Sequence, residues 1–292
     1  MIKVKKYIHG ALVSNAASMG FNWIYNMPYL ERLEKEQDLT FQKADPAKYK
    51  RARKAVLAYP YAKVGDVSLQ GEIAKWLYKL LQENPQATKD DYETMVFENI
   101  KPGGHYRGWI ESYGQKLIYN KLTASLKTDN AILSIEDDQL VGFIPYIVSK
   151  ELSLPNEKAW EMAQVFTNNE DYLNFYTVFD NVLENLKTMA MKDALKAAIP
   201  LAPRHFGFKL TMALQMDDSK SFVQQLAETS CAIQYAIPLT FNILANTASY
   251  EEAVKLNTRL GGASSDRGML LGMLYAQISE IPKSWLAKTN FN

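Results

Sequence analysis

Apolar residues recur at intervals of three and four through most of the chain, which is the spacing of amphipathic helices. The pattern predicts helices over 5–20, 90–99, 109–126, 140–152, 155–166, 170–198, 206–216, 219–235 and 250–258, and another between Gly65-Asp66-Val67-Ser68 and Asn84-Pro85. Pro28 is expected to stop the first helical stretch, and the lysine-rich residues 35–64 to form a long irregular surface loop. Strict alternation and Asn-Gly hairpin turns, the usual signs of strands, are missing. The sequence therefore predicts an all-α fold.

The last long apolar segment follows the turn Gly261-Gly262 and is apolar on almost every face, so it is predicted to be a central core helix. Gly268, Gly272 and Ala276 recur every four positions and form a stripe that another helix could approach closely. An interior glycine such as Gly272 costs about 1 kcal/mol relative to alanine, which favours close packing as its reason. A second interpretation is that the positive end of this helix faces a ligand or an anion.

Composition narrows the classes of partner. The formal net charge is +1, from 33 basic and 32 acidic residues, which argues against a nucleic-acid or anionic-membrane surface. A single cysteine, Cys231, excludes an internal disulfide framework and suits a reducing compartment. No apolar run is long enough to span a membrane. The start of the chain only loosely imitates a secretion signal, because His9 and Ser14 interrupt it. We expect one compact domain over residues 1–292, located in the cytoplasm.

Candidate chemistry rests on carboxylates, because no P-loop, HExxH, Gly-x-Ser-x-Gly or dinucleotide fingerprint is present. Asp66 and Glu72 flank one predicted helix start, and Asp266 lies beside the glycine turn. Such carboxylates could bind a cation, or serve as acid and base in glycosidic cleavage. The alternative is that Asp66 caps its helix, Glu72 is solvated and Asp266 interacts favourably with a helix dipole.

Other reactive residue types point to structural roles. His9, His105 and His205 are too few for a histidine-rich metal site and are expected to be surface or hydrogen-bonded side chains. Cys231 lies in an apolar stretch and is expected to be a small buried residue rather than a nucleophile. The aromatic and amide residues 21–26 could stack on and hydrogen-bond a ring such as adenine, or could belong to the core.

Four segments, in this order, resemble the ADP-ribosylglycohydrolase family, in particular the branch that lacks the usual paired metal-binding aspartates. Residues 10–26 (GALVSNAASMGFNWIYN) are similar to G-x-L-V-A-D-A-L-x-x-G-x-H-W-I-Y-D, and residues 65–72 (GDVSLQGE) to G-D-x-T-H-Y-G-[DE]. Ser230-Cys231 with Pro238 and Leu244 resembles the S-C…P…L segment of that branch. Residues 261–268 (GGASSDRG), followed by Ile281-Pro282 and Trp285, look like G-G-D-N-x-[SA]-R-[AG]…I-P-x-x-W.

The resemblance implies an all-α domain with a cleft between helix starts. In active relatives this cleft holds two divalent cations, usually magnesium, and cuts the N- or O-glycosidic bond between ADP-ribose and a protein side chain. The chain departs from the metal-dependent pattern: Leu69 and Gln70 stand where two aspartates would sit, as do Ala263 and Ser265. Magnesium requires hard oxygen ligands, so a two-metal site is not expected, and Asp266 remains a weak candidate for a single cation. Against the metal-poor branch, Asn15, Asn22 and Asn26 replace Asp, His and Asp.

The leading hypothesis is therefore a degenerate member of this family without the dinuclear metal site. It would bind ADP-ribose or a related nucleotide, alone or on an ADP-ribosylated protein, with lost or altered hydrolase activity, or serve only as a structural or interaction protein. The ligand-binding candidates are Asn22, Trp23, Tyr25, Asn26, Ser68, Ser264, Ser265 and Arg267. The alternative is a metal-independent glycoside hydrolase in which Asp66 and Glu72 are acid and base and Arg267 holds an anionic group, although a structural role for Arg267 is equally compatible with the sequence. Carboxyls about 5–10 Å apart across an open cleft would favour the enzyme, and divergent or buried ones would favour the binding protein. An accidental likeness, with the chain an unrelated helical protein, is the third hypothesis.

Overall fold

The computed structural model describes residues 6–124 and 139–291, and within these ranges extended pairing is limited to two isolated bridges, from Ile24 to Ala55 and to Gly262. The helices of the first half are α1 (Lys6–Ser18), η1 (Met19–Phe21), α2 (Met27–Glu34), α3 (Pro46–Ala52), α4 (Leu69–Glu83), α5 (Lys89–Ile100), α6 (Ser112–Leu122), α7 (Phe143–Leu152) and α8 (Asn156–Ala163). Those of the second half are α9 (Asp171–Asn185), α10 (Met191–Ala198), η3 (Ile199–Leu201), η4 (Arg204–Phe206), α11 (Gly207–Gln215), α12 (Ser219–Gln225), α13 (Ile233–Ala245), α14 (Tyr250–Leu260), α15 (Ser264–Tyr275) and α16 (Lys283–Lys288). The predicted all-α fold is confirmed. None of the described helices combines the length and the apolarity that crossing a bilayer requires.

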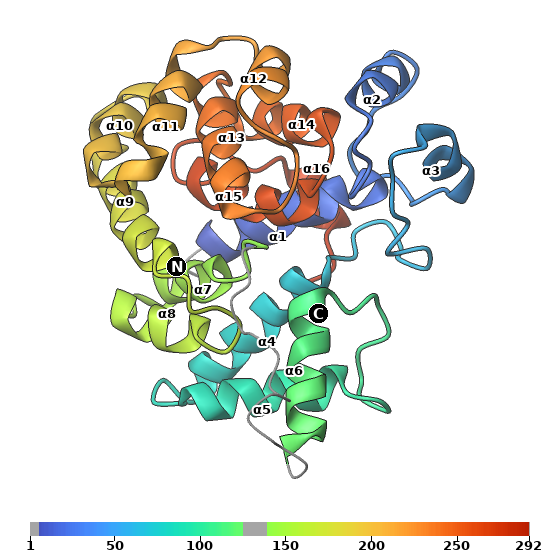
Figure 1. The fold of residues 1–292 in the computed structure, drawn as a ribbon, viewed down its shortest axis with the longest axis vertical. Helices are drawn as coiled ribbons and strands as arrows, with labels where there is room; N and C mark the ends of the chain where they lie inside the picture. The colour runs from blue at the N-terminus through green and yellow to red at the C-terminus, as the bar shows by residue number, and fades with distance from the viewer. Residues whose placement is uncertain (1–5, 125–138, 292) are drawn as a thin grey trace.

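Helices α1 and α15 lie against each other at the centre of the molecule (Figure 1). Every residue of α15 is buried, as predicted for a core helix. A Cβ atom at Gly272 would lie 2.1 Å from the carbonyl oxygen of Gly10, and one at Gly10 would lie 2.3 Å from the carbonyl oxygen of Gly272. Backbones therefore touch where the sequence predicted a stripe of small residues, and α1 is the helix that approaches it.

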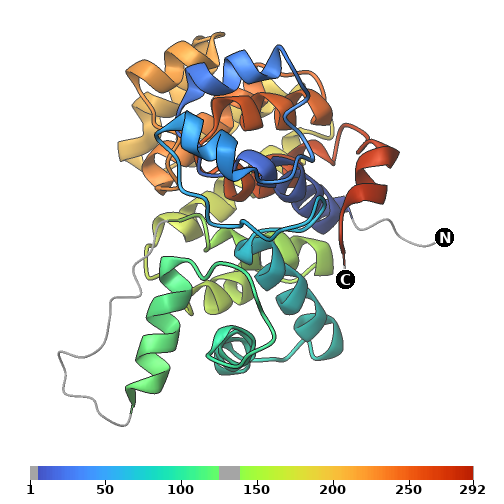
Figure 2. The same cartoon turned by 90° about the vertical axis from the view of Figure 1, so that its right-hand side faces the viewer.

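The remaining helices surround this central pair. Helices α9–α14 lie on one side of it and α4–α6 on the other, and a view turned by 90° shows the same division (Figures 1 and 2). Helices α2 and α3 stand at one edge and share a small core of their own, formed by Phe21, Ile24, Leu30, Leu39, Ala44, Tyr49 and Ala52. The segment that follows α3 leads directly to the start of α4, so both ends of the edge unit border the region where candidate site residues gather.

The predicted long loop over 35–64 is wrong in its middle, because α3 lies within it. Asp45 caps this helix by accepting a hydrogen bond from the amide of Ala47 (2.8 Å), and Pro46 occupies its first turn. Proline is suited to that position because its fixed φ matches the helix and its missing N–H is not needed there. Pro28 likewise opens α2 rather than ending a helix, with Asn26 as its cap. Local capping chemistry, not periodicity, marks both helices.

Two further boundaries differ from prediction. The stretch 170–198 is divided into α9 and α10, and 219–235 breaks after Gln225, with α13 running on through Pro238. Pro238 cannot donate to the carbonyl of Gln234, and the Nζ atom of Lys209 donates to that oxygen instead (3.3 Å). Burial on nearly all sides of α13 then outweighs the proline cost. Thr128-Asp129-Asn130, whose residue types predict a turn, and Asp137-Asp138, which precede the predicted helix over 140–152, lie outside the described residues.

The start of α1 is capped from another helix. The Glu151 carboxylate, at the end of α7, accepts hydrogen bonds from the amides of Tyr7 (2.9 Å) and Ile8 (3.3 Å). We expect Glu151→Ala to lower the free energy of unfolding by about 1 kcal/mol, because two amides at the positive end of the helix lose a charged acceptor. Urea unfolding checks this, with Glu83→Ala, an exposed glutamate, as the near-neutral control. If the free energy of unfolding of Glu151→Ala equalled that of the wild type, water would be replacing the cap without loss of stability.

Candidate functional site

The start of α15 is fixed by the glycine turn in front of it. Gly261 and Gly262 have φ values of 76° and 68°, which favour glycine. A Cβ at Gly262 would lie 1.8 Å from the carbonyl oxygen of Thr229. Gly262 also exchanges backbone hydrogen bonds with the 23–24 segment, donating to Ile24 O and accepting from Trp23 N, each at 2.7 Å. This close approach of backbone at the turn places the aromatic segment beside the start of α15.

A buried hydrogen-bond network joins the starts of α4 and α15 through α1. Asn15, on α1, donates from Nδ2 to Ser68 Oγ (2.8 Å) and to the carbonyl of Ser265 (3.1 Å), and it accepts from the Ser68 amide (2.8 Å). Ser68 Oγ in turn donates to Asp266 Oδ1 (3.2 Å). Asn22 accepts from the Ser265 amide (3.0 Å). Five residues that the resemblance singled out, Asn22, Ser68, Ser264, Ser265 and Asp266, are thus buried together.

Arg267 has a structural role in the turn. Its Nε atom donates to Asn257 Oδ1 (2.7 Å) and its Nη2 atom to the carbonyl of Gly261 (2.8 Å), so the fully buried guanidinium ties the end of α14 to the start of α15. Burial lowers the pKa of Arg267 to about 10, although Tyr25, Asp266 and Cys231 oppose the shift. The side chain is therefore still a cation at neutral pH, and its Nη1 atom has no partner within the protein.

Buried polar atoms without protein partners gather around the start of α15. They are Asn22 Nδ2, Trp23 Nε1, Ser264 Oγ, Ser265 Oγ, Asp266 Oδ2 and Arg267 Nη1. Each unpaired buried group costs about 1–3 kcal/mol, and native proteins usually satisfy such groups with ordered water or a ligand. Five of the eight predicted ligand-binding residues contribute an atom to this set. The cluster is the candidate binding site.

The other predicted ligand residues have different surroundings. Both ends of the Asn26 side chain serve the fold, because Oδ1 accepts from the Tyr29 amide (3.1 Å) and Nδ2 donates to the Ala52 carbonyl (2.8 Å). Tyr25 is 37% exposed, and burial of its remainder, aided by Cys231 and Asp266, raises the pKa of its hydroxyl to about 12. Cys231 is half-buried, so the expectation of a buried thiol holds only in part. Tyr25 and Cys231 are thus partly exposed residues within electrostatic reach of Arg267.

The oxygen ligands at the centre do not suit a pair of magnesium ions. Leu69 and Ala263 have no side-chain oxygen, and Gln70 donates its amide to the carbonyl of Gln139 (2.6 Å). Burial raises the pKa of Asp266 to about 7, against the lowering effects of Ser68 and Arg267. The narrow cavity beside Gln70 and Asp266 has no space for a water molecule. Across 6–124 and 139–291, no three His, Cys, Asp or Glu side chains converge as metal ligands.

Asp66 and Glu72 lie outside this network and line an open pocket of ≈ 460 Å³. Asp66 accepts from the Lys63 amide (2.8 Å), and Glu72 forms an ion pair with Lys75 (2.8 Å). Burial raises the pKa of Glu72, while Lys75 opposes the shift. Asp66 and Glu72 thus line the same open pocket, and the enzyme alternative stays a prediction.

Tyr59 and Glu111, which the sequence did not predict as site residues, form the wall between this pocket and the buried network. Tyr59 lines the pocket, donates its hydroxyl hydrogen to Glu111 (2.7 Å) and accepts from the amide of Leu69 at the start of α4 (3.1 Å). Tyr59 and Glu111 are both buried. They are 52 positions apart and belong to no motif, so no local signal in the sequence could have paired them.

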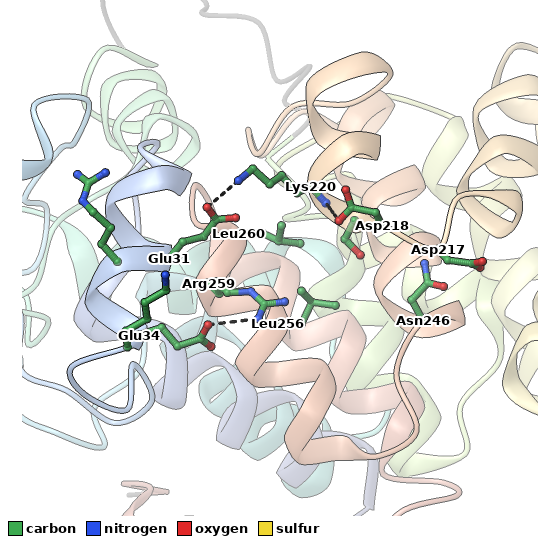
Figure 3. Close-up of a pocket in the computed structure, with 12 residues that line it drawn as sticks. Glu31, Glu34, Asp217, Asp218, Lys220, Asn246, Leu256, Arg259 and Leu260 are labelled. Carbon is green, nitrogen blue, oxygen red and sulfur yellow. Dashed lines mark hydrogen bonds and ion pairs between the residues drawn. The ribbon is translucent and has the colours of Figure 1, made fainter.

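A larger pocket, ≈ 570 Å³, lies between α2, α12 and α14 (Figure 3). Two ion pairs cross it, from Lys220 to Glu31 (2.7 Å) and from Arg259 to Glu34 (3.2 Å). No sequence-predicted site residue lines it. Partly exposed ion pairs of this kind typically contribute 0–1 kcal/mol each, so they fasten α2 only weakly.

The three histidines were expected to be surface or hydrogen-bonded side chains, and no atom of theirs belongs to the cluster at the start of α15 described above. His205 is largely exposed and lies 3.0 Å from Asp171, and the ring of His9 packs on that of Phe291 at 4.5 Å between centroids. His105 is exposed.

The fold is similar to that of a solved structure. A solved structure titled "ADP-ribosylglycohydrolase-related protein complex" aligns with 99% of this chain and 94% of its own, with a TM-score of 0.65 and 15% sequence identity. No family model matches the sequence, and no curated protein matches it. The chain therefore has an ADP-ribosylglycohydrolase-like fold.

Proposed function

We propose that the protein binds ADP-ribose or a related nucleotide at the start of α15, without a dinuclear metal centre. On this proposal, hydrolysis of the N- or O-glycosidic bond is lost or altered. The observation that carries it is the set of unpartnered buried atoms on Asn22, Trp23, Ser264, Ser265 and Arg267. Hydroxyl and amide groups suit ribose hydroxyls and an adenine ring, and a guanidinium beside a helix start suits a phosphate.

The charges of the residues present disfavour a dinuclear metal centre. Two dications close together need several anionic ligands, and the motif positions supply mainly neutral or apolar side chains around Asp266. A hydrogen-bonded Ser68–Asn15–Ser265 arrangement takes up the space between the two helix starts instead. Substrate cleavage by metal-activated water therefore has no support in these residues.

Calorimetric titration of ADP-ribose, with and without magnesium, tests the proposal. Binding that magnesium does not change would support it. Binding strengthened by magnesium would contradict the loss of the metal centre. An absence of binding in both buffers would contradict the nucleotide site and favour a purely structural or interaction role.

Ser264→Ala and Ser265→Ala separate a binding role from a folding role. We expect each to weaken ADP-ribose binding about 5–10-fold, the value of one hydrogen bond. Thermal unfolding of the free protein should be unchanged or shifted upward, because an unpaired buried hydroxyl is removed. Ser68→Ala is the matched control, since its hydroxyl has two protein partners and its loss should lower stability by about 1–2 kcal/mol. Equal affinity in all three variants would contradict the assigned site.

A second candidate function has one observation in its favour: Asp66 and Glu72 line the same open pocket. The raised pKa of Glu72 suits a general acid, with Asp66 as the base. If this candidate is right, magnesium-free hydrolysis of an ADP-ribosylated protein is measurable and is lost in both Asp66→Asn and Glu72→Gln. An inactive wild-type protein would rule it out.

A further inference from the structure

Cys231, the only cysteine of the chain, is held beside the starts of two helices. Two residues before it, the carbonyl of Thr229 accepts a hydrogen bond from the amide of Ala263 (2.9 Å), directly ahead of α15. Two residues after it, Ile233 is the first residue of α13. Cys231 itself is half-buried rather than enclosed. Its position thus combines partial exposure with two helix starts.

Positive charge reaches this position from three elements. The start of α13, a helix of 13 residues, carries roughly half a unit of positive charge. Lys209, on α11, reaches the same helix start and donates to the carbonyl of Gln234 (3.3 Å). Arg267, on α15, is fully buried and lies within electrostatic reach of Cys231. Cysteines beside helix N-termini and cationic side chains are the ones that ionise and react readily.

Arg267 gives an independent sign that an anionic group belongs beside it. Its Nε and Nη2 atoms donate to Asn257 Oδ1 and to the carbonyl of Gly261, which are both neutral acceptors. Its buried Nη1 atom has no partner in the described part of the chain. A buried cation without an anionic partner is costly. A thiolate at Cys231 would supply the missing negative charge.

The other titratable groups near Arg267 are less suited to this task. Burial raises the pKa of the Tyr25 hydroxyl to about 12, so this group is neutral at physiological pH. Burial raises the pKa of Asp266 to about 7, so its carboxyl is only partly ionised there, and its Oδ1 atom accepts from Ser68 on the α4 side. Of the three groups that act on the charge of Arg267, this leaves Cys231.

We propose that Cys231 is a modification site, a reactive thiolate that hydrogen peroxide oxidises to a sulfenic acid. The thiolate sulfur attacks one peroxide oxygen, and the O–O bond breaks as the S–O bond forms. The second oxygen leaves as hydroxide, which takes a proton from solvent to become water, so that sulfur loses two electrons and the peroxide gains them. Because the chain has no second cysteine, the sulfenic acid forms no internal disulfide, and an external thiol converts it to a mixed disulfide. The proposal does not depend on nucleotide binding.

The single cysteine makes the test quantitative, because every thiol modification reports on one residue. The full chain, folded and unfolded in urea, is treated with iodoacetamide at pH 7, and alkylation is followed by whole-protein mass spectrometry. We expect folded Cys231 to react at least fivefold faster than the same thiol in the unfolded chain. Hydrogen peroxide followed by dimedone should add one dimedone to the folded protein and none to Cys231→Ser. A folded thiol that reacts no faster than the unfolded one, or a folded protein without the dimedone adduct, would overturn the proposal.

Charge changes at a neighbouring surface position test whether the positive field is responsible. Gln234 is exposed and lies in the first turn of α13. Gln234→Lys should speed alkylation at least twofold and Gln234→Glu should slow it at least twofold, because they add opposite charges beside the thiolate. Gln234→Asn is the neutral control and should leave the rate unchanged. Equal rates in the Lys and Glu variants would contradict an electrostatically stabilised thiolate.

Arg267→Met tests the second source of positive charge. The variant should slow alkylation of the folded protein at least fivefold, because the buried cation is removed. Arg267 also ties α14 to α15, so circular dichroism first establishes that the variant is folded. If it is not, the Gln234 variants decide the outcome. A folded Arg267→Met protein that reacts as fast as wild type would contradict the role given to Arg267.

Discussion

Replacing Gly272 by alanine is expected to destabilise the protein by about 3 kcal/mol or more, although alanine is the better helix former by about 1 kcal/mol. The added Cβ would lie 2.1 Å from the carbonyl oxygen of Gly10, and real Cβ atoms do not approach that closely. The obstacle is backbone on a facing helix, which no side-chain rotation relieves, so α1 and α15 would have to separate. Urea unfolding measures the effect.

Two companion variants make the result interpretable. Gly10→Ala meets the Gly272 carbonyl at 2.3 Å from the opposite side and should be destabilised similarly. Gly207→Ala, at the first residue of α11, has no atom within 4 Å of the added Cβ and should be neutral or slightly stabilised. A Gly272→Ala protein more stable than wild type would mean that helix propensity, and not the close backbone contact between α1 and α15, governs this position.

The central helix could be predicted because its signals are local. The small residues four apart and the apolar surface on all sides both lie in one stretch of sequence. They predict a buried helix that another helix approaches closely, but not which helix that is. Gly10 matches the first glycine of the motif over 10–26, but a single glycine in a helical pattern carries no sign of the helix that it will meet. Helix α13 was missed for the opposite reason: Pro238 argues against a helix locally, and only burial and the Lys209 contact overcome it.

The candidate site likewise contains residues that local motifs predicted and residues that only long-range packing brings into place. The order of the four motif-like segments predicted that Asn22, Ser68, Ser265 and Asp266 would lie near one another, and hydrogen bonds join them in a buried network. The Tyr59–Glu111 contact and the roles of Asn15 and Asn257 depend on long-range packing and have no sequence signature. Asp66 and Glu72 were predicted as a pair, but the structure puts them on the pocket side of that wall, away from Asp266.

Asp266 is expected to make the folded protein less stable as pH rises, so its replacement should stabilise the protein at high pH. Burial raises its pKa to about 7 from an ordinary value of 3.8. The unfolded chain releases the proton near pH 4 and the folded protein only near pH 7, so the folded state binds more protons between these values. Stability from this group is complete below pH 4 and is lost as pH rises through 7. The full shift corresponds to at most about 4 kcal/mol.

Asp266→Asn should remove this dependence, because the amide keeps an oxygen for Ser68 and carries no charge. The variant should match wild type near pH 4 and be more stable at pH 8, in urea unfolding across that range. Asp218→Ala is the control of opposite sign: hydrogen bonds from Ser221 lower the pKa of Asp218 at the start of α12, so its loss should destabilise at neutral pH and less so in acid. If Asp266→Asn were equally stable relative to wild type at every pH, the carboxyl would have to be ionised while buried. The neighbouring Arg267, and not a bound ligand, would then be its counter-charge.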